Sequence, residues 1–466
     1  MPPNILWIMT DQHRLDCVGA YAETPVRTPH LDRLASRSVV FDRHYTTCPL
    51  CVPARSSLHT GRYTHSCGAI INGFGSTRFR KDSVLKPDEV TLPELLAQAG
   101  YHVGHTGVDH VRAEPPLRQR GCFSTYLSKA EHTRYAEERG LCFPSMRPHQ
   151  HECPTRVGDE TRSMFYSSPV PGVHPFPLED FLDVFYARKA AEFVAQAPQD
   201  QPFACLCFLW LPHPPFVIPE PYASMYSPEE VTFPPNLPGT QEGKPRMHLR
   251  HLPGQVGAGR SLDEWRASWA AYWGCVTLVD ECIGKVFAAL EARGDADNTL
   301  IAFHPDHGEM LGVHSYFQKM VCYEESAHVP LMISGPGITP GRRSCLTSHV
   351  DLLPTFLDYA GIPVPSRVQG HSLRGVLEGS ATGVREAAFS EYNGNAAPDL
   401  YQRCVVSGDH KYIWNAEDID ELYDLCEDPY EMRNMAGDSA KQPVRQELRE
   451  RLSEWMRETE DFLELT

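Results

Sequence analysis

The sequence of 466 residues lacks any long hydrophobic run. Its longest apolar runs, such as residues 203–211, fall well short of the roughly 20 residues that a membrane-spanning helix needs. Residues 1–10 also lack the basic segment and the small-residue cleavage site of a secretory signal. We therefore expect a cytoplasmic protein that does not associate with membranes.

Positive charge is scarce, with 43 Lys and Arg residues against 60 Asp and Glu residues and a net charge of -17. This balance argues against non-specific nucleic-acid binding. It leaves an anionic substrate open, because a buried metal and a few cations can reverse the field locally. The 15 cysteines are an odd number in a long chain without a secretory signal, so we expect buried or free thiols rather than a disulfide framework.

What the chain does have is an alternation of apolar runs and helical patterns, typical of an α/β protein with a mostly parallel sheet. Helices are indicated by apolar periodicity and by capping residues such as Thr28, before Pro29, and Gly100. The expected strands cover residues 4–9, 101–105, 203–211, 300–303 and 329–334, and the expected helices residues 28–34, 92–99 and 276–290.

A change of pattern around residues 361–375 predicts a domain boundary. We expect a catalytic α/β domain over residues 1–375 and a smaller C-terminal subdomain over residues 376–466. The latter shows short strand patterns at 387–392, 402–407 and 412–415 and a terminal helix at 444–458. Residues 113–180 and 212–262 are rich in Pro, Gly and His with little periodicity, and we interpret them as long loops over the site.

Polar residues follow several of the predicted strands directly. They are Asp11, His110, His213 and the pair Asp306-His307. In mostly parallel sheets, ligands bind beyond the carboxyl ends of the strands. These residues are therefore expected to meet at one edge of the sheet.

The segment from Cys51 to Arg62, CVPARSSLHTGR, places a thiol, a rigid proline and a guanidinium at fixed spacing before a helical pattern. A cysteine here is a candidate nucleophile, or the precursor of one. Taken alone, a cysteine is more often a buried thiol. A redox or zinc pair of Cys48 with Cys51 is the other alternative, but the chain offers no matching second pair.

Cys51-x-Pro53-x-Arg55, followed by Thr60-Gly61-Arg62, resembles the signature of the sulfatases of the alkaline phosphatase superfamily. The resemblance covers residues 3–435 and implies a large, mostly parallel sheet sandwiched by helices, with a smaller C-terminal α+β domain that carries an antiparallel sheet. Flanking blocks agree in order; they are TDQ at 10–12, TPHLD at 28–32, PHPPF at 212–216, DHGEMLG at 306–312 and SHVDLLPT at 348–355.

The resemblance implies that Cys51 is oxidised to formylglycine by a maturation enzyme. One hydroxyl of the hydrated aldehyde attacks sulfur and expels the alcohol. The other then collapses to the aldehyde and expels sulfate, so the enzyme never hydrolyses its own sulfate ester.

The same resemblance implies one divalent metal ion on Asp11, Gln12, Asp306 and His307. The commoner sulfatase pattern has Asp in place of Gln12 and Asn in place of His307. The variant seen here is similar to the choline sulfatase and phosphonate monoester hydrolase branch. Because imidazole suits borderline ions, manganese competes with calcium for this site.

Further roles follow from the family pattern. Arg55 would stabilise the nucleophile, and His110 would contact its hydroxyl. His213 and its partner Lys319 would bind sulfate and assist the leaving oxygen. Asn72 would lie near the sulfate.

Val108 departs from the family, because many sulfatases carry a sulfate-binding lysine here. Either Arg112, Arg78 or Arg80 substitutes for that lysine, or the site handles its anion with less positive charge. The phosphonate monoester hydrolases also lack it, which widens the plausible substrates to phosphodiesters and phosphonate monoesters.

The sequence thus predicts a metal-dependent, arylsulfatase-like hydrolase of sulfate esters, acting on a small molecule or a saccharide. The alternatives are a phosphonate monoester or phosphodiester hydrolase with the same site, and a non-catalytic anion-binding homologue in which Cys51 stays a thiol. A homo-oligomer is possible, with the C-terminal domain as the interface.

Overall fold

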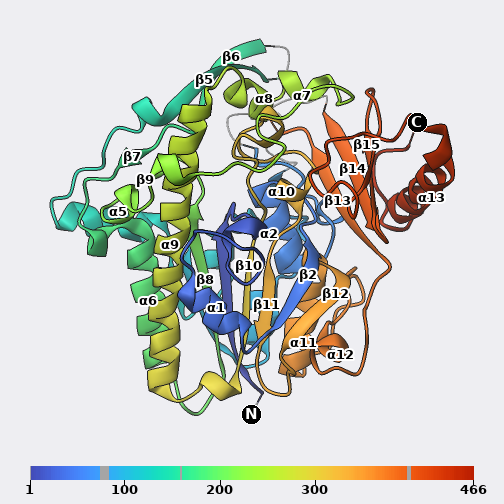
Figure 1. Cartoon of the computed structure of the whole chain (residues 1–466). Helices are drawn as coiled ribbons and strands as arrows, with labels where there is room; N and C mark the ends of the chain where they lie inside the picture. Colours follow the sequence, from blue (N-terminus) through green and yellow to red (C-terminus); the bar gives the residue numbers. More distant parts are fainter. Residues whose placement is uncertain (1, 74–82, 158–159, 396–399, 466) are drawn as a thin grey trace.

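An eight-stranded sheet forms the centre of the computed structural model, which describes residues 2–73, 83–157, 160–395 and 400–465. Figure 1 shows this sheet with helices on both sides. Its neighbouring strands are, in order, β12 (Gly341–Ser348), β2 (Val39–Tyr45), β11 (Leu331–Ser334), β10 (Thr299–Pro305), β1 (Asn4–Asp11), β8 (Phe203–Pro212), β3 (His102–Gly107) and β4 (Thr125–Leu127).

Strand β1 lies in the middle of the sheet and is buried along its whole length. Leu6 and Ile8 belong to one hydrophobic cluster, and Ile5, Trp7 and Met9 belong to another. Because side chains alternate along a strand, these two clusters lie on opposite faces of the sheet. A strand with both faces covered reads as a continuous apolar run, which is why the sequence identifies it.

Helices cover both faces. The first cluster includes residues of α1 (Pro29–Ala35), α6 (Leu182–Gln196) and α9 (Leu262–Arg293), and the second includes residues of α2 (Cys51–Thr60), α4 (Leu92–Gln98), α11 (Leu352–Ala360) and α12 (Arg374–Leu377). Helix α9 has 32 residues and packs along α6 (Figure 1). Ser261 and Glu264 form the capping box at its start, and Gly294 ends it in the left-handed conformation.

The sheet is mostly parallel, as predicted, with one reversal. Strand β11 runs antiparallel to both β10 and β2, whereas the other pairs of neighbours are parallel. Among the described residues, no helix combines the length and the apolar character that a membrane crossing requires.

The prediction of structureless loops over residues 113–180 is wrong in part. This stretch holds helix α5 (Lys129–Glu138), whose capping box joins Ser128 to Glu131, and a hairpin of β5 (Gln150–Val157) and β6 (Glu160–Ser167). Helix α5 is short and mostly polar, so apolar periodicity gives little signal for it. Other short elements are α3 (Thr64–Cys67), α7 (Met247–Arg250), α8 (Leu252–Gly257), α10 (Glu324–Ala327), β7 (Gly172–Val173) and β9 (Val217–Ile218).

A separate antiparallel sheet follows near the C-terminus, as predicted. It contains β13 (Ala387–Asn393), β14 (Tyr401–Ser407), β15 (His410–Asn415) and β16 (Glu421–Asp424), and α13 (Gln442–Glu458) packs on β14 and β15 (Figure 1). The exact division into residues 1–375 and 376–466 stays a prediction.

Candidate active site

Cys51 is the first residue of α2, and every residue of this helix is buried. The helix starts in the extended backbone of Leu50 and ends at Gly61, where φ is 66°. The first turn of a helix leaves backbone N–H groups without helical partners. Asn72 supplies one such partner, because its Oδ1 accepts a hydrogen bond of 3.0 Å from the Val52 N–H. The predicted substrate ligand Asn72 thus lies beside the nucleophile position.

Three predicted residues meet around Cys51. One ligand atom each of Asp11, Cys51, Asp306 and His307 lies within 4.8 Å of all the others, and all four residues are buried. The Cys51 Sγ is 3.2 Å from His307 Nε2 and 3.7 Å from Asp11 Oδ1. Asp11 ends β1 and Asp306 directly follows β10, and these two strands are parallel neighbours. The sheet topology therefore brings the two carboxylates together.

Arg55 fixes these carboxylates, one helical turn after Cys51. Its Nη2 is 2.7 Å from Asp11 Oδ2, and its Nε is 2.8 Å from Asp306 Oδ2. The two Oδ1 atoms instead face His307 Nε2, at 3.9 Å from Asp11 and 3.6 Å from Asp306. Since the His307 Nδ1 hydrogen-bonds to the Gly308 carbonyl at 3.0 Å, the neutral ring presents an unprotonated Nε2 to the same point.

The electrostatics of this cluster match a cation site. Burial and the charge of Asp306 raise the pKa of Asp11 above its ordinary value. Burial opposes ionisation of Asp306, but His307 and Arg55 hold its pKa below its usual range. Burial lowers the pKa of His307 to about 4, so the ring is neutral, the form that binds metals. The Oδ1 atoms of Asp11 and Asp306, which we call the inward oxygens, and the Nε2 of His307 thus fit a divalent cation.

Burial and the charge of Asp11 raise the pKa of the Cys51 thiol well above its ordinary value. A protonated thiol is a poor nucleophile, because the thiolate is the reactive form. In this environment an unmodified Cys51 is therefore held in its unreactive state.

Gln12 is held in a left-handed turn, with φ at 67°, just beyond β1. The Gln12 Oε1 accepts a hydrogen bond from the Lys319 Nζ, and its Nε2 donates to the Glu309 carboxylate. The hydroxyl of Tyr272, on α9, donates to the Gln12 carbonyl at 2.8 Å. Neither Glu309 nor Tyr272 is among the predicted site residues. The DHGE motif is a signal for Glu309, whereas Tyr272 comes from a distant helix without any motif.

His110 and His213 belong to the same neighbourhood. The His110 Nδ1 is 3.9 Å from Asp11 Oδ2. Burial lowers the pKa of each histidine well below the usual value, and the charge of Lys319 lowers both further. The ring of His213 packs against that of Trp210, with centroids 4.2 Å apart. The structure therefore brings together all the predicted site residues.

The structure also shows what surrounds Val108, the residue at the position of the missing lysine. The backbone carbonyl of Val108 accepts a hydrogen bond from the Arg55 guanidinium, so this segment adjoins the cluster even without a cation. Arg112 donates to Ser83 Oγ at 3.2 Å. Arg78 and Arg80 lie outside the described residues.

Comparisons with known proteins identify the family of the chain. The model of the sulfatase family matches residues 3–362, and that of the C-terminal region of N-sulphoglucosamine sulphohydrolase matches residues 312–458. The chain belongs to the sulfatase family. This confirms the resemblance and makes the chain a member of a family of sulfuric ester hydrolases.

Relatives of this sulfatase match over nearly its full length. An ulvan-active sulfatase of Formosa agariphila is 27% identical, covering 98% of this chain and 82% of the relative. A choline-sulfatase of Rhizobium meliloti is 28% identical, covering 95% and 84%. The solved phosphonate monoester hydrolase of Agrobacterium radiobacter has a TM-score of 0.82 at 25% identity, covering 98% of this chain and 96% of that one.

Among the cavities formed by the described residues, two bear on the function of this sulfatase. The first, which we call the apolar cavity, has a volume of about 540 Å³ and includes His110 in its wall. Its apolar lining consists mainly of Val108, Phe143, Met146, Phe181, Trp210 and Val217.

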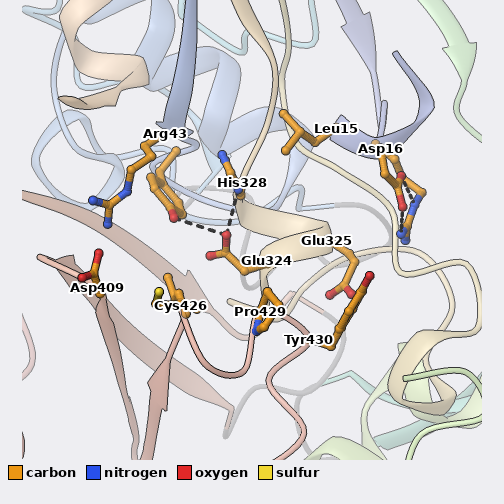
Figure 2. Close-up of a pocket in the computed structure, with 13 residues that line it drawn as sticks. Leu15, Asp16, Arg43, Glu324, Glu325, His328, Asp409, Cys426, Pro429 and Tyr430 are labelled. Carbon is orange, nitrogen blue, oxygen red and sulfur yellow. Dashed lines mark hydrogen bonds and ion pairs between the residues drawn. The ribbon is translucent and has the colours of Figure 1, made fainter. Parts of the chain in front are cut away.

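The second, which we call the charged cavity, has a volume of about 460 Å³ and lies between α10 and the C-terminal sheet. Figure 2 shows Arg43, Glu324, His328 and Asp409 around it. Some of its polar side chains are paired: Glu324 is 2.8 Å from the His328 Nδ1 and 2.6 Å from the Nζ of the buried Lys411, which lies outside the lining. None of the predicted site residues lines this cavity.

Proposed function

We propose that this sulfatase hydrolyses sulfate esters, with Cys51 converted to formylglycine and with one divalent cation beside it. The observation that carries the proposal is the convergence of Asp11, Asp306 and His307 on Cys51, within 4.8 Å. The conversion is an oxidation in which oxygen replaces sulfur, so it needs a maturation enzyme that supplies an oxidant. The hydrated aldehyde would supply the attacking hydroxyl.

In this proposal, the cation is held by the inward oxygens of Asp11 and Asp306, the Nε2 of His307 and the amide oxygen of Gln12. A bound divalent cation offsets negative charge on the transferring group and orients the nucleophile. The imidazole favours manganese, whereas the oxygen ligands also suit calcium.

The chain's own residues supply the remaining functions. Arg55 keeps both carboxylates oriented through its contacts of 2.7 and 2.8 Å. Lys319 and His110 place positive charge and a hydrogen-bonding ring beside the sulfate. The His213 Nδ1 donates to the Pro214 carbonyl, so the neutral ring presents an unprotonated Nε2, which must first take up a proton before it can assist the leaving oxygen as an acid.

A phosphonate monoester or phosphodiester hydrolase is the second candidate function. It is supported by Val108 in place of the lysine and by the TM-score of 0.82 to a phosphonate monoester hydrolase. Parallel assays with an aryl sulfate, a phosphodiester and a phosphonate monoester separate the two. We expect the sulfate to be hydrolysed fastest, and faster turnover of a phosphorus ester would favour the second candidate.

Mass spectrometry tests the modification itself, on protein co-expressed with a formylglycine-generating enzyme. We expect the peptide containing Cys51 to be about 18 Da lighter than the unmodified form. Cys51→Ala should abolish turnover, whereas Cys48→Ala, at a neighbouring buried thiol, should retain it. An unmodified Cys51 in protein that turns over sulfate would overturn the proposal.

A further inference from the structure

The apolar cavity adjoins the site through the segment that follows β3. His110 lines this cavity and also lies 3.9 Å from Asp11, measured from Nδ1 to Oδ2. Val108 lines it as well, and its carbonyl accepts a hydrogen bond from Arg55. A group that extends from an ester held at Cys51 past His110 therefore enters this cavity.

Trp210 joins the cavity to the two site histidines. Its ring centroid is 4.2 Å from that of His213, and it meets His110 edge-on at 5.9 Å. The indole is also part of the cavity lining, together with Phe143 and Phe181. Aromatic side chains gain most from contact with flat apolar rings.

The polar side chains in the lining are mostly engaged elsewhere. Asp109 accepts a hydrogen bond from the Tyr126 hydroxyl, and the His132 Nε2 hydrogen-bonds to the Asp180 carbonyl at 2.9 Å. Burial lowers the pKa of His174 to about 4, so this ring is neutral. Among the described lining residues, Lys129 and Asp109 carry opposite charges. The lining therefore has no excess of positive charge for a second anionic group.

A saccharide would fit this lining poorly. Many of its hydroxyls would lose water against apolar side chains, and burial of an unpaired hydroxyl is costly. An apolar ring would instead remove its own surface and that of the lining from water. The volume of about 540 Å³ is typical of cavities that bind small molecules.

We propose that the apolar cavity binds the organic group of the substrate, and that this sulfatase prefers sulfate esters of apolar, ring-containing alcohols and phenols. This proposal rests on the proposed function, because it assumes that the enzyme hydrolyses a sulfate ester. The cavity would hold the organic group that leaves with the alcohol oxygen. Val108 then contributes to substrate specificity, because it completes an apolar wall at a position where many sulfatases carry a lysine.

A binding experiment without turnover tests the cavity. The full-length Cys51→Ala variant is titrated calorimetrically with phenol, 2-naphthol and glucose. We expect 2-naphthol to bind at least about tenfold more tightly than phenol, because its second ring buries more apolar surface, and glucose to show no binding. Equal affinities for phenol and 2-naphthol would overturn the proposal.

Substitutions in the same background locate the binding. Trp210→Ala should weaken 2-naphthol binding about tenfold, and Trp210→Phe should restore most of it. Phe143→Ala, at a side chain that is 46% exposed and so of little importance for folding, should weaken it about threefold. The matched control is Tyr430→Ala in the charged cavity, which should leave binding unchanged. Loss with Tyr430→Ala, or no loss with Phe143→Ala, would contradict the assignment.

Turnover by the matured wild-type enzyme separates this inference from the proposed function. We expect a higher kcat/KM for 2-naphthyl sulfate than for phenyl sulfate or a 6-O-sulfated glucosamine. Fastest turnover of the sulfated sugar would overturn the inference and leave the proposed function intact. Tight binding of 2-naphthol without hydrolysis of any sulfate ester would support the cavity and overturn the proposed function.

Discussion

The apolar cavity and the charged cavity have similar volumes, about 540 and 460 Å³, but opposite chemistry. The charged cavity is lined by polar and charged groups, of which Glu324 contacts His328 and, on β15, the buried Lys411. The apolar cavity has fewer charges but opens beside His110 and Trp210. The difference teaches that a concentration of charged side chains is not by itself evidence for a binding site, because a charge that already has a protein partner is less available to a ligand.

The largest expected difference is between the cluster around Cys51, where a substitution should abolish most of the activity, and the charged cavity, where it should not. Asp306→Asn removes one inward carboxylate charge from the cluster, so we expect it to lose bound metal and to lower kcat about 1,000-fold or more. Elemental analysis and steady-state assays measure both effects. Asp409→Asn, in the charged cavity, should change kcat less than about twofold. Full activity in Asp306→Asn would show that the ligand assignment is wrong.

A substitution of Lys411, near the charged cavity, should instead lower stability. Lys411 is fully buried, and its Nζ lies 2.6 Å from Glu324 and 2.9 Å from Glu431. Lys411→Met removes the cation from the buried Glu431 and the partly buried Glu324, and we expect the free energy of unfolding to fall by about 3–5 kcal/mol. Thermal or denaturant unfolding measures this. Lys441→Met, at a partly exposed pair with Asp424, should cost less than about 1 kcal/mol. Equal losses would contradict the assignment.

Asp183 links stability to the apolar cavity, because its Oδ1 accepts hydrogen bonds from the Trp210 and Leu211 N–H groups at 2.6 and 3.1 Å. Burial raises the pKa of Asp183 from 3.8 to about 7. Between these pH values the folded chain keeps a proton that the unfolded chain has lost, so this group lowers stability as pH rises. Its contribution is about 1.4 kcal/mol per pH unit.

Asp183→Asn should remove this slope, which unfolding measurements at pH 5 and pH 7 would show. Asp280→Asn is the control, because burial also raises the pKa of Asp280 to about 7 and its carboxylate accepts backbone N–H groups of α1 instead. Both variants should lose a similar slope, but only Asp183→Asn should alter 2-naphthol affinity. An unchanged slope would mean that Asp183 is ionised in the folded protein.

The smallest expected effect concerns the residue that departs from the family. Val108→Lys introduces a cation into the apolar wall, and we expect 2-naphthol to bind about five- to tenfold more weakly because a buried charge is costly. The measurement is the same calorimetric titration. Tighter binding of 2-naphthol by the variant would show that position 108 does not form the apolar wall.

Much of the fold could be predicted from local pattern. Strands such as β1 and β8 are buried on both faces and read as apolar runs, and α9 carries both caps and periodicity. Strands β2 and β12 were not predicted, because they mix polar and apolar residues near one side of the sheet. The reversal of β11 depends on tertiary pairing that no local pattern encodes.

The site likewise contains residues that local pattern predicts and residues that depend on tertiary contacts. The predicted site residues follow strand ends or lie in motifs, and the topology brings them close together; their roles stay predictions. Trp210 and Tyr272 carry no motif, and their importance comes from contacts made across large sequence distances, such as the hydrogen bond from Tyr272 to Gln12. Which atoms of the two carboxylates face inward could not be predicted either, because it depends on the placement of Arg55.

The burial of α2 has a consequence for how this protein is made. Cys51 is 2% exposed, and all the residues of its helix are buried behind it. For the proposed conversion of Cys51 to formylglycine, this burial implies that a maturation enzyme would have to act while the chain is still unfolded, so that modification and folding would compete in time. A cell that folded the chain first would then accumulate a stable protein that could not be activated without being unfolded.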